Sequence, residues 1–207
     1  MRVLTKSEVI EWLSWFENMG TEYPHCDGEG LFFTDPEARC IDLEYPIKLE
    51  RLPWFVRFLA TIGYEERDFE GALLWFISWG IWSSPDEAVG YRVVEAMHRA
   101  AGQPKSFETA PGNLFRGDEL PDAVAMLMQP IIFGFDAYYL PKWSYGTEQF
   151  FLFISHDSFL TVVARTKQFY DKVFGLLQEL ELSPKPGNET RLRRFCRGDL
   201  PPAKDRA

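Results

Sequence analysis

Cysteine and long apolar runs are both scarce in this 207-residue sequence. It has three cysteines, an odd number, and its first 16 residues contain neither an uninterrupted apolar stretch nor a small-residue cleavage site. We therefore expect a cytoplasmic protein with reduced thiols. The most apolar run, from Ala72 to Trp82, covers only 11 residues. A helix that crosses a bilayer needs about twice that length, so we expect no membrane segment.

Sequence motifs for catalysis or cofactor binding are also missing. The chain contains no phosphate-binding glycine loop, dinucleotide fingerprint, His-Glu-x-x-His motif or EF-hand loop. It also lacks a Gly-x-Ser-x-Gly nucleophile elbow. Carboxylates are plentiful, but no spacing singles out an acid–base pair. We therefore expect no cofactor and no metal.

The charge is distributed unevenly along the chain, whose net charge is −9. Residues 183–207 hold seven basic and three acidic residues and carry +4, so the remaining 182 residues carry −13. An acidic body repels nucleic acid and attracts a basic protein partner. The basic segment is predicted to dock on the body or to be solvated, and contact with nucleic acid is the alternative. We expect one domain over residues 1–182 and a basic tail over 183–207.

Helical patterns dominate the first two thirds of the sequence. Apolar residues recur at helical spacing, with caps or glycine stops, in five segments before residue 134. These segments are 5–20, 53–63, 72–82, 84–102 and 121–133. The segment 72–82 is apolar on all sides, which is typical of a buried helix. The turn-rich residues 103–117 are predicted to form a loop.

Strand patterns are concentrated after residue 135. Three β-rich runs, 136–141, 149–155 and 159–165, follow one another closely, which favours an antiparallel meander. A last helix follows the cap residue Thr166. The run GLFFT, the turn at residues 35–38 and the alternating residues 41–45 predict an N-terminal hairpin that extends this sheet. We expect an α+β fold, mainly helical in its N-terminal two thirds, with an antiparallel β-meander and a C-terminal helix at the end.

The run Ser155-His156-Asp157-Ser158 contains the residue types of a hydrolase triad. It lies between two β-rich runs, and its polar residues are turn formers, so we interpret it as the tip of a hairpin. Adjacent residues do not place a base between a nucleophile and an orienting acid. His156 remains a candidate for a site that is completed by other loops.

Two further sets of residues are candidate sites. His25, Cys26 and Cys40 have metal-capable side chains, but they supply three ligands where zinc usually takes four. The alternative is that Cys40 is a small buried residue at the start of a strand. The second set is aromatic: Tyr138, Trp143 and Tyr145 surround the loop LPKWSYGTE, where they either line a contact surface or belong to a core that is rich in aromatic rings.

Two hypotheses of function follow from these patterns. The first is a non-catalytic binding protein that presents an acidic and aromatic surface to a basic partner. Its candidate binding residues are Tyr138, Trp143, Tyr145 and His156. In composition and arrangement the chain is similar to bacterial toxin-immunity proteins, although no motif carries this similarity and no residue role follows from it. The alternative is a small hydrolase whose site, including His25, Cys26 and His156, is assembled from distant loops.

Overall fold

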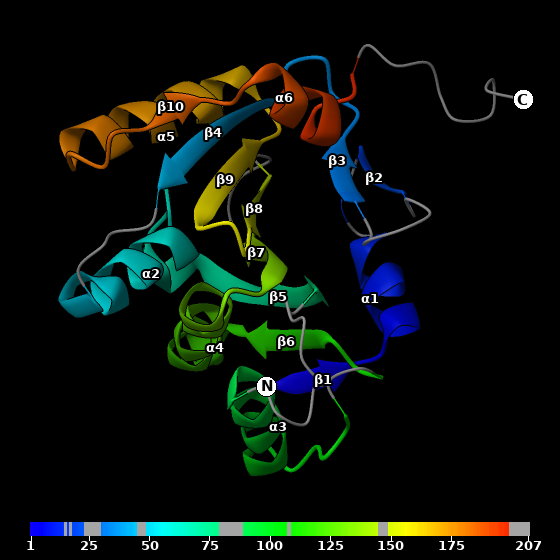
Figure 1. Ribbon diagram of the computed structural model, residues 1–207. Helices are drawn as coiled ribbons and strands as arrows, with labels where there is room; N and C mark the ends of the chain where they lie inside the picture. The colour runs from blue at the N-terminus through cyan, green and yellow to red at the C-terminus, as the bar shows by residue number, and fades with distance from the viewer. Residues whose placement is uncertain are drawn as a thin grey trace, which may run out of the picture.

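A computed structural model gives the fold of this chain (Figure 1). The structure describes residues 1–14, 16, 18–22, 30–44, 49–78, 89–106, 109–144 and 149–198. His25, Cys26 and Tyr145 lie outside these ranges.

An eight-stranded antiparallel sheet is the centre of the described fold. Its strands run in the order β1-β6-β5-β7-β8-β9-β4-β10. A separate two-stranded sheet pairs β2 with β3. The strands are β1 (Arg2–Leu4), β2 (Met19–Glu22), β3 (Gly30–Phe33), β4 (Arg39–Glu44), β5 (Phe69–Ser78), β6 (Gly112–Arg116), β7 (Asp136–Trp143), β8 (Phe150–Ile154), β9 (Phe159–Ala164) and β10 (Lys185–Pro186).

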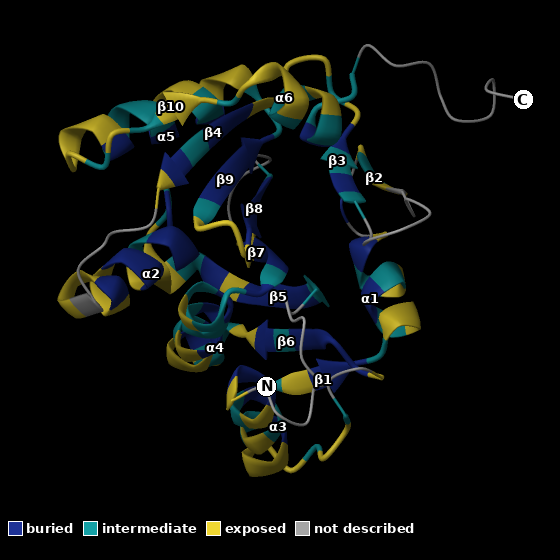
Figure 2. Ribbon diagram, in the orientation of Figure 1, coloured by how far each residue is buried: buried dark blue, intermediate teal, exposed yellow. Residues whose placement is uncertain are grey.

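Helices and the small sheet cover the two faces of the large sheet. Helices α2 to α5 pack on one face, whereas α1, α6 and the β2–β3 pair lie on the other (Figure 1). The inner strands are buried on both sides, and the outward faces of the helices are exposed (Figure 2). The helices are α1 (Lys6–Leu13), α2 (Leu52–Ala60), α3 (Val89–Ala100), α4 (Leu120–Phe133), α5 (Lys167–Glu179) and α6 (Glu189–Phe195). Within the described ranges, no helix is both long and apolar enough to cross a membrane.

The predicted fold class is wrong in its central statement, because the N-terminal two thirds are not mainly helical. Strands β1 to β6 lie in that part of the chain. We expected residues 72–82 to form a buried helix, but residues 72–78 belong to the long strand β5, and residues 79–82 lie outside the described ranges. The predicted loop 103–117 contains β6, which pairs with β5. The mixed α+β character remains, but a large antiparallel sheet dominates the fold.

The start of the chain also differs from the prediction. The first helix was expected to reach Gly20, but α1 ends at Leu13 and Met19–Glu22 forms β2. The expected N-terminal hairpin does not form either. Strand β3 pairs with β2, and β4 joins the large sheet beside β9.

Several local predictions are confirmed. Strands β7, β8 and β9 form the expected antiparallel meander. Thr5 and Glu8 form a capping box at the start of α1, and Thr166 caps α5 by accepting a hydrogen bond from the Phe169 backbone N–H. Gly102, the predicted stop of the helix before it, follows α3 in the left-handed conformation, with φ at 71°.

The described part of the basic segment docks on the body. Lys185–Pro186 forms β10, which pairs with β4. Phe195, in α6, is completely buried on the face of the sheet that also carries α1. Arg194 stacks over the ring of Phe153 in β8, with 4.3 Å between the guanidinium carbon and the ring centre. Residues 199–207 lie outside the described ranges.

The outer edge of β1 is covered by side chains from the segment that follows α3. The amide of Gln103 accepts a hydrogen bond from the Val3 backbone N–H at 2.8 Å and donates one to the Met1 carbonyl at 2.9 Å. The ammonium group of Lys105 donates to the Val3 carbonyl at 3.3 Å. Both backbone polar groups of Val3 are therefore satisfied on the side that faces away from β6.

Candidate functional site

The Ser155-His156-Asp157-Ser158 run forms the tip of the β8–β9 hairpin, as predicted. The backbone N–H of Ser155 donates to the Phe159 carbonyl at 3.0 Å, and Ser158 takes a positive φ of 64°. The side-chain oxygen of Ser155 is buried and accepts a hydrogen bond from the Asp157 backbone N–H. Ser155 therefore has a structural role in the turn.

His156 is held between two carboxylates. Its Nδ1 lies 2.9 Å from an Asp136 carboxylate oxygen, which also accepts a hydrogen bond from the His156 backbone N–H at 2.8 Å. Its Nε2 lies 3.4 Å from an Asp157 carboxylate oxygen. The hydrogen bond with Asp136 raises the pKa of His156 above its usual 6.5. Both ring nitrogens therefore face acids, and the described structure gives this histidine no nucleophile to activate.

The raised pKa predicts a pH-dependent contribution of His156 to stability. Because the folded-state pKa exceeds the unfolded value, the stabilisation is fully present below about pH 6.5 and is lost as the pH rises through the folded-state pKa. His156 is exposed and solvent screens its contact with the partly buried Asp136, so we expect less than about 1 kcal/mol. In Asp136→Asn, which keeps an acceptor for the backbone N–H, the pKa of His156 should fall towards 6.5 when titrated by NMR. An unchanged His156 pKa in this variant would contradict the assignment to Asp136.

The other residues predicted to form a site do not converge. Cys40 is buried in β4, as the structural interpretation predicted, and it pairs with Val163. Val163 lies four residues along β9 from Phe159 at the hairpin end, which is roughly 13 Å. Within the described residues, no group of three or more His, Cys, Asp or Glu side chains could hold a metal ion.

The aromatic candidates Tyr138 and Trp143 belong to the core. Tyr138 is 0% exposed, and its hydroxyl accepts a hydrogen bond from the Leu31 backbone N–H at 3.3 Å. Trp143 is 8% exposed and stacks on Tyr64 with 4.5 Å between ring centroids. Neither ring is available as a contact surface in the described structure.

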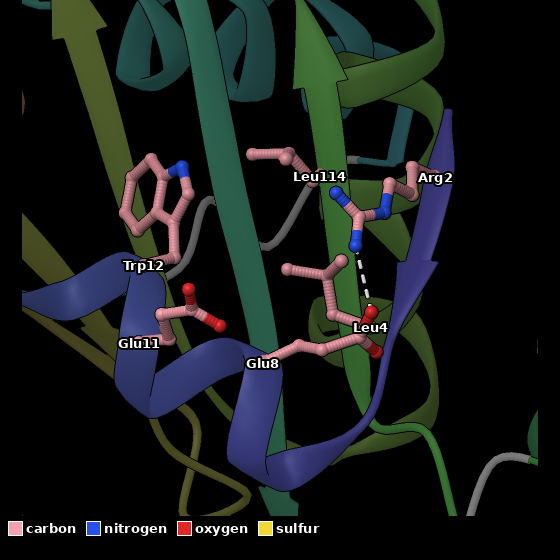
Figure 3. Close-up of a pocket in the computed structure, with 6 residues that line it drawn as sticks. All are labelled: Arg2, Leu4, Glu8, Glu11, Trp12 and Leu114. Carbon is pink, nitrogen blue, oxygen red and sulfur yellow. Dashed lines mark hydrogen bonds and ion pairs between the residues drawn. The ribbon is translucent and has the colours of Figure 1, made fainter.

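A pocket that the sequence did not indicate lies between α1 and the edge of the large sheet. It has a volume of about 210 Å³, and we call it the Trp12 pocket (Figure 3). Its lining residues come from β1, α1 and β6, and they are Arg2, Leu4, Glu8, Glu11, Trp12 and Leu114. In Figure 3 the side chains from α1 face those of the two strands across the opening.

The local sequence explains why α1 lies so close to these strands. The Thr5 capping box starts the helix directly after β1, so the chain turns back over the sheet. A Cβ atom at Gly112 in β6 would lie only 2.4 Å from a Val9 methyl group, so the missing side chain of this glycine lets the helix approach. Replacing Gly112 by a larger residue would push α1 away and deform the pocket.

The Trp12 pocket combines an indole with two carboxylates. At 100° per residue, Glu8, Glu11 and Trp12 lie within an arc of about 100° on one flank of α1. Val9 and Leu13 are fully or almost fully buried, whereas Trp12 is half-buried at the margin of this apolar stripe. The sequence pattern placed Trp12 in the stripe with them. The position of Trp12 beside the acidic residues Glu8 and Glu11 is the sequence signal that could have revealed the site.

The two carboxylates, those of Glu8 and Glu11, differ in their partners. Glu8 accepts hydrogen bonds from the Thr5 backbone N–H at 2.8 Å and from Arg2 at 2.7 Å. These hydrogen bonds lower the pKa of Glu8 to about 2, and the bond from Thr5 has the largest effect. Glu11 is exposed, and its carboxylate forms no ion pair or hydrogen bond with any residue that the structure describes. The lining therefore carries one unpaired negative charge.

A second pocket, of about 190 Å³, lies between β4, β9 and the C-terminal segment, but its charges are already paired. Lys185 donates to Glu44 at 2.9 Å, and the Arg191 side chain lies 3.7 Å from Asp42. The unpaired Glu11 carboxylate therefore distinguishes the Trp12 pocket from this one.

Comparison with protein-family models, with curated proteins and with solved structures found no match to this chain.

Proposed function

We propose that this protein is a non-catalytic binding module that holds a basic protein partner, in the manner of a bacterial immunity or inhibitor protein acting in the cytoplasm. The observation that carries the proposal is the Trp12 pocket, where an unpaired Glu11 carboxylate stands beside a half-buried indole. Tryptophan is enriched among the residues that dominate protein–protein affinity.

Size and charge both support this function. Pockets for small-molecule substrates usually measure about 300–1,000 Å³. The Trp12 pocket, at about 210 Å³, is below that range and is better matched to a single protein side chain. The net charge of −13 outside the basic segment would steer a cationic partner towards the protein and raise its association rate.

The function is tested by reversing the charge at Glu11. The full chain is immobilised and used to capture proteins from the source organism, and a captured basic protein is purified for calorimetry. Glu11→Lys should weaken its affinity by at least about tenfold, because a favourable charge contact becomes a repulsive one.

Glu179→Lys is the matched control for this experiment. It changes the net charge by the same amount, at an exposed residue in the last turn of α5, on the opposite face of the sheet. The control should bind almost as tightly as the unchanged protein. Equal affinity of the two variants, or the absence of any basic protein among those captured, would overturn the proposal.

A further inference from the structure

We infer that the Trp12 pocket receives the side chain of one arginine from the partner. This inference rests on the proposed function and deepens it, because it assigns the chemical group that enters the pocket. Three observations carry it: the charge of the lining, the chemistry of its walls and the way the protein binds its own arginines.

The charge of the lining matches a single cation. Glu8 already contacts two cations, Arg2 at 2.7 Å and Lys105 at 3.8 Å, whereas the carboxylate of Glu11 has no cationic partner among the described residues. One cation from a partner would therefore pair with Glu11. A second cation would meet the Arg2 guanidinium, which Figure 3 shows projecting into the space beside Leu114.

The walls of the pocket favour a guanidinium over an ammonium. A guanidinium is planar and weakly hydrated, so it can stack on the Trp12 indole while its edge donates two parallel hydrogen bonds to a carboxylate. Leu4 and Leu114 supply apolar surface for the aliphatic part of the side chain. A lysine ammonium is a compact, strongly hydrated charge and would lose the planar stacking.

The protein uses the same arrangement for its own arginines in the docked C-terminal segment. The guanidinium carbon of Arg191 lies 3.7 Å from the centre of the Phe159 ring, and that of Arg197 lies 4.2 Å from the centre of the Phe32 ring. The Arg191 side chain is also 3.7 Å from the Asp42 carboxylate, so ring and acid hold one guanidinium together. Trp12 and Glu11 offer the same pair of groups, and neither has a cationic partner among the described residues.

The test uses the full ¹⁵N-labelled chain and three capped amino acids as probes: N-acetyl-arginine amide, N-acetyl-lysine amide and N-acetyl-citrulline amide. Citrulline is the neutral analogue of arginine with nearly the same shape. The indole N–H signal of Trp12 is identified by its loss in Trp12→Phe. Arginine amide should shift this signal saturably, lysine amide should bind at least about threefold more weakly, and citrulline amide should produce no saturable shift.

Paired variants make the result specific to the pocket. Glu11→Gln should weaken the binding of arginine amide about tenfold, which corresponds to about 1.4 kcal/mol, whereas Glu179→Gln should leave it unchanged. Equal shifts with arginine and citrulline, equal binding of lysine, or an arginine response that survives Glu11→Gln would each overturn the inference.

This outcome is independent of the test of the proposed function. The arginine probe could fail to bind while Glu11→Lys still lowers the affinity for the purified partner and Glu179→Lys does not. The binding function would then be supported and the arginine assignment would be wrong. If the arginine probe binds but Glu11→Lys leaves the affinity for the partner unchanged, the proposed function of the pocket is wrong.

Discussion

Replacing Phe195 by alanine is expected to lower the free energy of unfolding by about 3–5 kcal/mol, as is usual for a fully buried phenylalanine. Phe195 is 0% exposed, and its ring centroid lies 6.0 Å from that of Phe151 and 5.3 Å from that of Phe153. Its removal would leave a cavity between α6 and β8. Equilibrium denaturation of the full chain measures the change directly.

Arg193→Ala is the control for this prediction. It alters the same helix, but Arg193 is exposed and pairs only with the equally exposed Glu189, so we expect a change below about 0.5 kcal/mol. A loss of less than about 1 kcal/mol in Phe195→Ala would mean that α6 contributes little to the folded state. A large loss would show that the docked part of 183–207 is integral to the fold, although composition alone suggested a separate tail.

Replacing Trp12 by alanine is expected to weaken partner binding by about 30-fold or more, which corresponds to about 2 kcal/mol. The indole forms one wall of the Trp12 pocket and packs against Phe16, with 5.0 Å between ring centroids. Truncation removes the stacking surface. It also lets water reach the contact between Glu11 and the partner, which weakens that contact. Calorimetry with the purified partner measures the loss.

Trp54→Ala is a closely matched control for Trp12→Ala. Trp54 also stacks on an aromatic residue four positions later, Phe58 at 5.8 Å, and it is 49% exposed. It lies on α2, which packs on the opposite face of the sheet. Affinity should change little in this variant. If both variants bind alike, with unfolding temperatures above that of the assay, the Trp12 pocket is not the contact site.

Signals that depend on a few neighbouring residues predicted the structure well. The capping box at Thr5, the cap at Thr166 and the left-handed stop at Gly102 act within one helical turn, so the sequence alone contains the relevant contacts. The β7–β8–β9 meander was predictable for the same reason, because its strands are neighbours along the chain.

Features that depend on distant partners were not predictable. Strand β5 is covered on both faces of the sheet, so its apolar residues do not alternate with polar ones and resemble a buried helix. Its neighbours β6 and β7 lie far along the chain. Because the sequence does not show which strands flank this segment, periodicity alone could not distinguish a buried strand from a buried helix.

The candidate site shows the same limitation. Glu11 and Trp12 could be placed on one helix from the sequence, but Leu114 reaches them only through the pairing of β6 with β1. The aromatic residues that looked most like a surface, Tyr138 and Trp143, are buried by elements that the sequence did not place there. A pocket between a helix and a strand a hundred residues away requires the tertiary fold.

The side chains along the outer edge of β1 have a consequence for self-association. By bonding to Met1 and Val3, the Gln103 amide acts as a surrogate strand and occupies the groups that an incoming chain would need. At the opposite edge, Pro186 in β10 has no N–H to donate. An eight-stranded sheet could template the growth of a fibril, and these groups oppose the addition of a strand at each edge. We therefore expect any protein partner to be recognised through side chains and not through unpaired edge backbone.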